Sequence, residues 1–122
     1  MSITGEQPVI PATIPAAGHL YQFTADGPGR WRLSGEVDVA VSDQFAASLA
    51  VAVGGAGATG AADCAISMDE LQFIDLSGLR ALAAAATAAG VRVELHGVPA
   101  VFWRYWYLAG FSEAVTSVYP VS

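Results

Sequence analysis

Apolar and polar positions alternate near the start of the chain, as they do in a half-buried strand. One short run of this kind covers residues 20–24, and a second covers residues 30–34, where Trp31 and Leu33 are the large apolar positions. The turn sequence Asp-Gly-Pro-Gly at 26–29 separates the two runs. This order predicts an antiparallel hairpin.

Helical spacing replaces the alternation after the hairpin. Large apolar residues recur every four positions between 45 and 53, and Ser42 or Asp43 is suited to cap the start of the helix. A glycine-rich stretch follows at 54–60. We expect the helix to end near Val53 and the glycines to form a loop.

A buried strand and a second helix are predicted in the middle of the chain. Residues 64–68 and 71–74 are apolar, and the polar pair Asp69-Glu70 between them predicts a break in the strand. The helix that follows is expected to end at Gly90. Its buried side is predicted at Leu79, Leu82, Ala83 and Ala86.

The outward side of this second helix is uncharged. It is predicted at Ala81, Ala84, Ala85, Thr87 and Ala88. A solvated helix face normally carries charges, so a flat surface that accepts a partner protein is one interpretation. A general drift of the composition toward alanine is the other.

The last third of the chain repeats the alternation of strand and helix. Residues 91–95 alternate cleanly, Pro99 suits the first turn of a third helix that stops at Gly110, and residues 115–119 can form a final short strand. In this third helix, the side predicted to face the core consists of Phe102, Tyr105, Trp106 and Ala109.

Two aromatic residues of the third helix are predicted to point outward. Trp103 and Tyr107 are four residues apart and therefore share a helix face. Exposed aromatic side chains are enriched in binding hot spots, so contact with a partner or with a second copy in a homodimer is one interpretation. Packing against the N-terminal tail is the alternative.

The elements follow the order β-β-α-β-α-β-α-β. Strands separated by helices predict an α/β fold, in which a mixed sheet has parallel strands joined by right-handed crossovers and is covered by helices. Residues 1–17 contain three prolines and no periodicity, so we expect a flexible N-terminal tail. Residues 18–122 are then one domain.

The composition excludes several classes of protein. Of the 122 residues, 54% are hydrophobic and 13% are charged, which suits a folded domain rather than a disordered chain. The net charge is −6 and the five cations are scattered arginines, so we expect no nucleic-acid partner. The sequence has neither a signal-peptide pattern nor an apolar stretch long enough for membrane insertion, so we expect a cytoplasmic location.

Metal and cofactor sites are not expected. His19, Cys64 and His96 lack metal-ligand spacing, and the single cysteine is interpreted as a buried thiol. The glycines at 55–60 fit the pattern G-x-G-x-x-G. A dinucleotide site requires a strand before that pattern, whereas a helix is predicted here.

Polar chemistry is concentrated in the turn between the buried strand and the second helix, at Asp75-Leu76-Ser77-Gly78. The first turn of a helix has free backbone N–H groups and partial positive charge, which suits a carboxylate or a phosphate. Asp75 is expected to cap the helix, to bind a partner, or to do both. Ser77 either bonds the local backbone or accepts a phosphate.

Three parts of the chain together resemble a known family. They are Gly35-Glu36-Val37-Asp38, the run from Phe73 to Leu82, and Val98-Pro99-Ala100-Val101 with Leu108-Ala109-Gly110-Phe111. These segments look like the STAS domain of bacterial anti-sigma factor antagonists, and the match covers roughly residues 18–120. The resemblance implies a single domain with a mixed four- to five-stranded sheet and helices mainly on one face.

The resemblance also implies a mechanism of regulation. Antagonists of this family bind an anti-sigma factor, in many cases a serine kinase, and phosphorylation of the hydroxyl residue directly after the aspartate reverses the binding. In this chain Leu76 occupies that position, which argues against the usual kinase switch. Ser77 matches the second hydroxyl position and is the candidate phosphorylation site.

We therefore predict a non-enzymatic, protein-binding regulator of transcription that needs no cofactor. It would bind an anti-sigma factor through the turn at residues 75–80 and the helix that follows. The predicted partner-binding residues are Asp38, Asp75, Leu76, Ser77, Gly78, Arg80, Trp103 and Tyr107. The alternative is a STAS-type accessory subunit that regulates a transporter or a transport ATPase.

Overall fold

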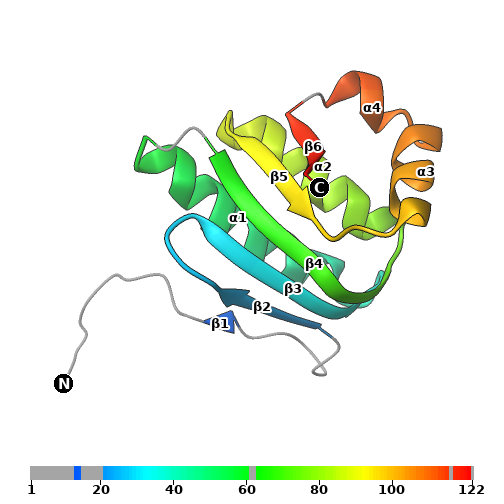
Figure 1. Cartoon of the computed structure of the whole chain (residues 1–122), viewed down its shortest axis with the longest axis horizontal. Coiled ribbons are helices and arrows are strands. Elements are labelled where there is room, and N and C mark those ends of the chain that lie inside the picture. The colour runs from blue at the N-terminus through cyan, green and yellow to red at the C-terminus, as the bar shows by residue number, and fades with distance from the viewer. Residues whose placement is uncertain (1–12, 15–20, 61–62, 116, 122) are drawn as a thin grey trace.

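Six strands form one mixed sheet in this computed structural model, which describes residues 13–14, 21–60, 63–115 and 117–121 (Figure 1). The elements in chain order are β1 (Thr13–Ile14), β2 (Tyr21–Ala25), β3 (Arg30–Val37), α1 (Ser42–Ala58), β4 (Asp63–Ile74), α2 (Leu76–Ala89), β5 (Arg92–His96), α3 (Ala100–Leu108), α4 (Phe111–Ala114) and β6 (Val118–Val121). Among the described residues, no helix has the length and apolar character that crossing a membrane requires.

The strands lie in the sheet in the same order as in the chain. β1, β2 and β3 pair antiparallel, whereas β3, β4, β5 and β6 pair parallel. The predicted α/β class with a mixed sheet is confirmed, and the two-residue β1 adds one strand to the expected number. Of the predicted tail at residues 1–17, Thr13–Ile14 form β1 and the rest lies outside the described residues.

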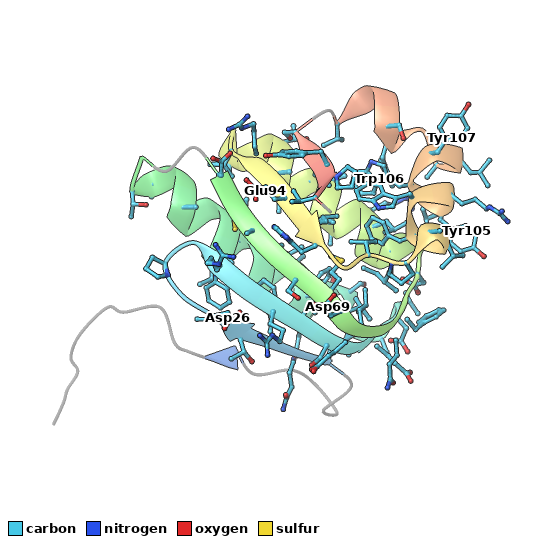
Figure 2. The ribbon with its side chains drawn as sticks, viewed as in Figure 1. Asp26, Asp69, Glu94, Tyr105, Trp106 and Tyr107 are labelled. Atoms are coloured by element: carbon cyan, nitrogen blue, oxygen red, sulfur yellow. The ribbon has the colours of Figure 1, made fainter. Side chains whose placement is uncertain are left out.

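Helices α1 and α2 cover one face of the sheet (Figure 1). The strands direct alternate residues toward these helices, so that Leu33, Ile66 and Leu95 of three neighbouring strands are fully buried. The opposite face is polar and carries Asp69 and Glu94 (Figure 2). Helices α3 and α4 lie at one end of the sheet. The expectation of helices mainly on one face is confirmed.

Helix α1 differs from the prediction at both ends. It continues through the glycine-rich stretch to Ala58, so the loop expected at 54–60 is wrong. Gly57 lies where α1 meets α2, and an added Cβ would stand 3.0 Å from the carbonyl oxygen of Ala89. The small residues therefore allow close helix packing. Val41 is the N-cap residue, not Ser42 or Asp43.

Strand β4 runs without a break from Asp63 to Ile74, so the interruption predicted at Asp69-Glu70 is wrong. Its pairing with β3 shifts between Arg32 and Ser34 and again between Gly35 and Glu36. Each shift accommodates an extra residue of β4 opposite the shorter partner. The polar pair therefore marks a bulged region inside the strand.

Helix α3 turns a different side to the core than predicted. Phe102 and Trp106 are buried, but Tyr105 is 54% exposed and Ala109 is also exposed, so their core assignment is wrong. Trp103 is half-buried and makes edge contacts with both buried aromatic rings. Helix α4 is absent from the prediction. It places the ring of Phe111 next to that of Trp106, with 4.8 Å between the ring centroids. The buried stripe is therefore displaced toward Trp103.

Candidate functional site

The carboxyl ends of β3 and β4 lie side by side and define the candidate site. Val37 pairs with Ile74, and the amide of Asp75 donates to the carbonyl oxygen of Val37 at 3.0 Å. Asp38 and Asp75 therefore follow adjacent parallel strands at the same edge of the sheet. In open α/β sheets this edge is where ligands and partners usually bind.

Asp75 caps α2, as the sequence predicts. Its backbone is extended, with φ −97° and ψ −175°, and its Oδ1 accepts a hydrogen bond from the amide of Gly78 at 3.1 Å. The hydroxyl of Ser77 donates to the same oxygen at 2.5 Å. Asp75 and Ser77 are thus held to each other within the first turn.

Gly78 allows the helix to start close to the two strands. An added Cβ would lie 2.5 Å from Cγ1 of Ile74 and 3.0 Å from Cγ1 of Val37. These distances are shorter than atoms can approach without displacement. A glycine at this position therefore fixes where Leu76 and Ser77 stand relative to the sheet.

Two predicted partner-binding residues point away from the core at the start of α2. Leu76 is 45% exposed and Arg80, one turn later, is exposed. Asp38 lies at the neighbouring strand end, where its Oδ1 accepts from the amide of Ala40 at 2.9 Å. The structure thus brings these three residues to one end of the sheet.

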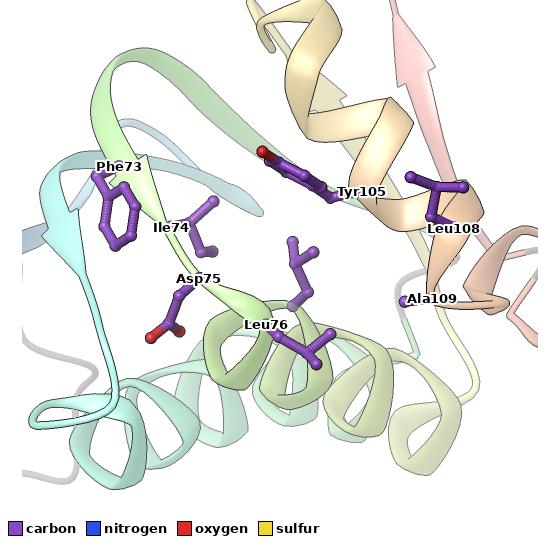
Figure 3. Close-up of a pocket in the computed structure, with 8 residues that line it drawn as sticks. Phe73, Ile74, Asp75, Leu76, Tyr105, Leu108 and Ala109 are labelled. Carbon is purple, nitrogen blue, oxygen red and sulfur yellow. The ribbon is translucent and has the colours of Figure 1, made fainter.

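An apolar groove of about 450 Å³ adjoins this turn (Figure 3). It lies between the end of β4, the start of α2 and helix α3, and its lining residues are Phe73, Ile74, Asp75, Leu76, Leu79, Tyr105, Leu108 and Ala109. Much of the lining is exposed, with Phe73 at 51% and Leu108 at 69%. Contiguous exposed apolar surface of this kind marks interaction sites.

Two apolar residues of α3 that line the groove are not among the predicted site residues. Tyr105 and Leu108 are exposed there, and the exposed Val101 lies one turn before Tyr105, whereas Tyr105 is predicted to face the core. A second apolar stripe beside the buried one was the available signal. Tyr107 is exposed as predicted, but Trp103 faces Val98 and Val121 on another side of α3.

Beyond the exposed Arg80, the outward side of α2 carries no charge from residue 81 to residue 88. Ala84, Thr87 and Ala88 are exposed, and Ala81 and Ala85 are half-buried against the core. Ala85 and Ala88 also line a furrow of about 360 Å³ between α1 and α2. Small side chains on this face permit another surface to approach closely.

The open face of the sheet is the main competing surface, and its polar groups largely pair with one another. Arg32 contacts Asp26 at 3.1 Å and Arg92 contacts Asp63 at 2.8 Å. Glu94 accepts from the hydroxyl of Tyr119 at 3.2 Å. A partner that covered this face would have to desolvate these charged groups, which costs free energy.

Two features of the described residues bear on metal binding and on cysteine chemistry. That part contains no group of three or more His, Cys, Asp or Glu side chains that could hold a metal ion. Burial, with a smaller effect from Glu94, raises the pKa of the Cys64 thiol to about 11. A nucleophilic cysteine requires the opposite shift, toward the thiolate.

A family model described as "Mlab, STAS domain" matches residues 23–117. Among solved structures, the anti-sigma factor antagonist SpoIIAA in its unphosphorylated form is 18% identical with a TM-score of 0.51, over 79% of this chain and 94% of that chain. The Bacillus cell fate determinant SpoIIAA in its phosphorylated form is 16% identical with a TM-score of 0.54, over 84% of this chain and 91% of that one.

An anion transporter contains a similar domain. The murine anion transporter Slc26a9 in its inward-facing state is 18% identical with a TM-score of 0.59, over 92% of this chain but 20% of the transporter. At such identities the likeness is one of fold. No match was found among curated proteins.

Proposed function

This chain belongs to the STAS domain family, and we propose that it acts as a regulatory protein-binding module of the anti-sigma factor antagonist type. In this proposal it binds an anti-sigma factor through the turn at residues 75–80 and the outward face of α2. The chain and the sigma factor compete for binding to the anti-sigma factor. Enzymatic chemistry has no part in the mechanism.

One observation carries the proposal: an uncharged, small-residue helix face is continuous with a turn that exposes Leu76 and Arg80. Such a face can be covered without desolvating charges, and desolvation of unpaired charge is a large cost of binding. The fold likeness to SpoIIAA extends over 94% of that chain, so it concerns the whole antagonist domain.

Control by phosphorylation differs in this proposal from the family pattern. Leu76 stands where the family carries its phosphorylated hydroxyl, and the Ser77 hydroxyl is bound to the carboxylate of Asp75. A phosphate on Ser77 would break that hydrogen bond and place its negative charge beside Asp75. The module is therefore constitutively competent to bind, or responds to a signal other than a kinase.

A second function, an accessory subunit of a transporter or transport ATPase, is favoured by the comparisons themselves. A similar domain occurs in an anion transporter, the murine Slc26a9. The same α2 face would then contact the transport protein.

Binding measurements with purified partners separate the two functions. The protein would be titrated calorimetrically with the anti-sigma factors and with the transport ATPases encoded in the same genome. Ala84→Arg, on the exposed face of α2, should weaken binding about tenfold or more. Val51→Glu, an exposed change on α1, should leave it unchanged. If the protein does not bind the anti-sigma factor, or if Ala84→Arg leaves the affinity unchanged, the first function is wrong.

A further inference from the structure

Strand β4 extends well beyond its neighbour β5. Their last paired residues are Ser67 and His96, yet β4 continues to Ile74. After His96 the chain turns at Gly97, whose φ is +69°, and Pro99 then leads into α3. Gly97 passes so close to Asp69 that an added Cβ would collide with the carboxylate. The chain therefore leaves the sheet at this point.

The sheet position next to residues 70–74 is left unfilled. Within the described residues, no backbone hydrogen bond joins this part of β4 to β5 or to α3. On its other side the same segment is paired with β3 as far as Ile74. β4 thus has one paired edge and one free edge, and a free edge is a template for another strand.

The apolar groove occupies the place of that absent strand. One wall is the end of β4, with Phe73 and Ile74, and the opposite wall is α3, with Tyr105 and Leu108 (Figure 3). A strand inserted there would lie in line with β5. Its backbone would pair with β4 while its side chains contacted the apolar wall.

Asp75 is the one charged residue among those that line the groove, and it stands at the β4 side. Cations are found on the helical sides, at Arg80 of α2 and at Arg104, next to Tyr105. A segment that carries a Lys or Arg would complement Asp75 and the net charge of −6.

We propose that the groove binds an extended segment of a partner protein, apolar with at least one basic residue, which adds to the free edge of β4 as a further strand. The inference rests on the proposed function in that the occupant is a protein, and it specifies the conformation and chemistry of what that protein presents. Main-chain hydrogen bonds supply the common binding mode, and the groove supplies the selectivity.

This chain itself is a poor occupant. Each copy has a net charge of −6, so two copies repel each other. Residues 1–12 contain Glu6 and no Lys or Arg. β1, to which they lead, pairs with β2, on the far side of β3 from the groove. Charge complementarity therefore favours a separate, basic partner.

Selection from a displayed library of random short peptides tests the proposal, with the full chain as bait. Enriched peptides should alternate apolar residues and carry Lys or Arg. On binding, those amides of residues 70–74 that point to the free edge of β4 should become protected from hydrogen exchange in NMR spectra. Methylation of those backbone nitrogens of the peptide that would pair with β4 should lower its affinity about tenfold or more.

Matched variants locate the peptide on the protein. Leu108→Glu, in the groove, should abolish binding, whereas Val51→Glu on α1 should have no effect. Ala84→Arg separates this inference from the proposed function, because it changes the α2 face and leaves the groove intact. If Ala84→Arg abolishes partner binding and Leu108→Glu does not, the groove is not the binding site, while the proposed function stands.

Other results would also overturn the inference. Enriched peptides with helical spacing, or with affinity unaffected by backbone methylation, would exclude strand addition. An absence of enriched peptides that respond to Leu108→Glu would exclude the groove as a peptide site. Self-association of the chain that Leu108→Glu abolishes would make a second copy the occupant.

Discussion

The hydroxyl of Ser77 donates a hydrogen bond to Oδ1 of Asp75 at 2.5 Å, and this oxygen also accepts from the amide of Gly78. Asp75→Ala removes both bonds and the helix cap, so the free energy of unfolding should fall by about 1 kcal/mol in urea denaturation. Asp75→Asn retains an acceptor oxygen and should lose less. Equal losses in the two variants would contradict the capping role.

The charge of Asp75 can be tested apart from the cap. Because Asp75→Asn keeps the acceptor and removes the charge, it should bind a selected basic peptide more weakly while remaining folded. The affinity, measured by calorimetry at two salt concentrations, should fall most at low salt. Unchanged affinity at low salt would show that the carboxylate serves the helix start alone.

The close contact at Gly78 predicts a large effect from a single methyl group. Gly78→Ala would place its Cβ 2.5 Å from Ile74 and 3.0 Å from Val37, which should cost about 1–3 kcal/mol of unfolding free energy. Gly54→Ala is the matched control, because nothing lies within 4 Å of its added Cβ inside α1. That variant should gain about 0.5–1 kcal/mol from helix propensity. Equal effects would refute steric contact as the cause.

The sequence predicted the order of the main elements because each depends on local patterns. Alternation specified β3 and β5, and the helical spacing from Leu79 to Gly90 specified α2 with its end. The turn at Asp75 could be predicted because a cap residue next to a helix start is a local signal. Local signals therefore account for the fold class and for the turn at Asp75, but not for the groove.

The remaining features depend on contacts between distant segments. Helix α1 continues past Val53 to a point where Gly57 lies against the end of α2, and the sequence near Gly57 does not indicate this contact. Tyr105 was assigned to the core since α4, which supplies Phe111 to Trp106, had not been foreseen. The groove exists because β5 ends at His96 while β4 continues, a length difference between two strands. These relations are set by tertiary packing.

Leu76 sets the expected response to a kinase. Incubation of the protein with anti-sigma kinases and ATP should leave residues 75–78 unphosphorylated in mass spectra, whereas Leu76→Ser should gain a phosphate at position 76. Leu76→Ala is the control for loss of the side chain. Because Leu76 is 45% exposed, neither change should cost more than about 1–2 kcal/mol. Stoichiometric phosphate on Ser77 of the unchanged chain would contradict this prediction.

Burial of Cys64 predicts a loss of stability in alkaline solution. The thiol lies in the core, and burial raises its pKa from an ordinary 9.0 to about 11, with a smaller contribution from Glu94. Above pH 9 the unfolded chain releases this proton while the folded chain retains it, so the unfolded state is favoured as pH rises. Two pKa units correspond to about 2–3 kcal/mol, lost progressively between pH 9 and 11.

A cysteine-free variant isolates this contribution. Tyr21 is also buried and its pKa is raised by desolvation, so some alkaline destabilisation should persist when the thiol is absent. Cys64→Ala should be less stable than the unchanged chain at neutral pH, because it leaves a cavity, but its urea midpoint should fall less steeply above pH 9. Parallel pH profiles for the two proteins would contradict the raised pKa. Slow modification of the native thiol by a disulfide reagent, with rapid modification in urea, would show that the thiol is buried, which is the main cause of its raised pKa.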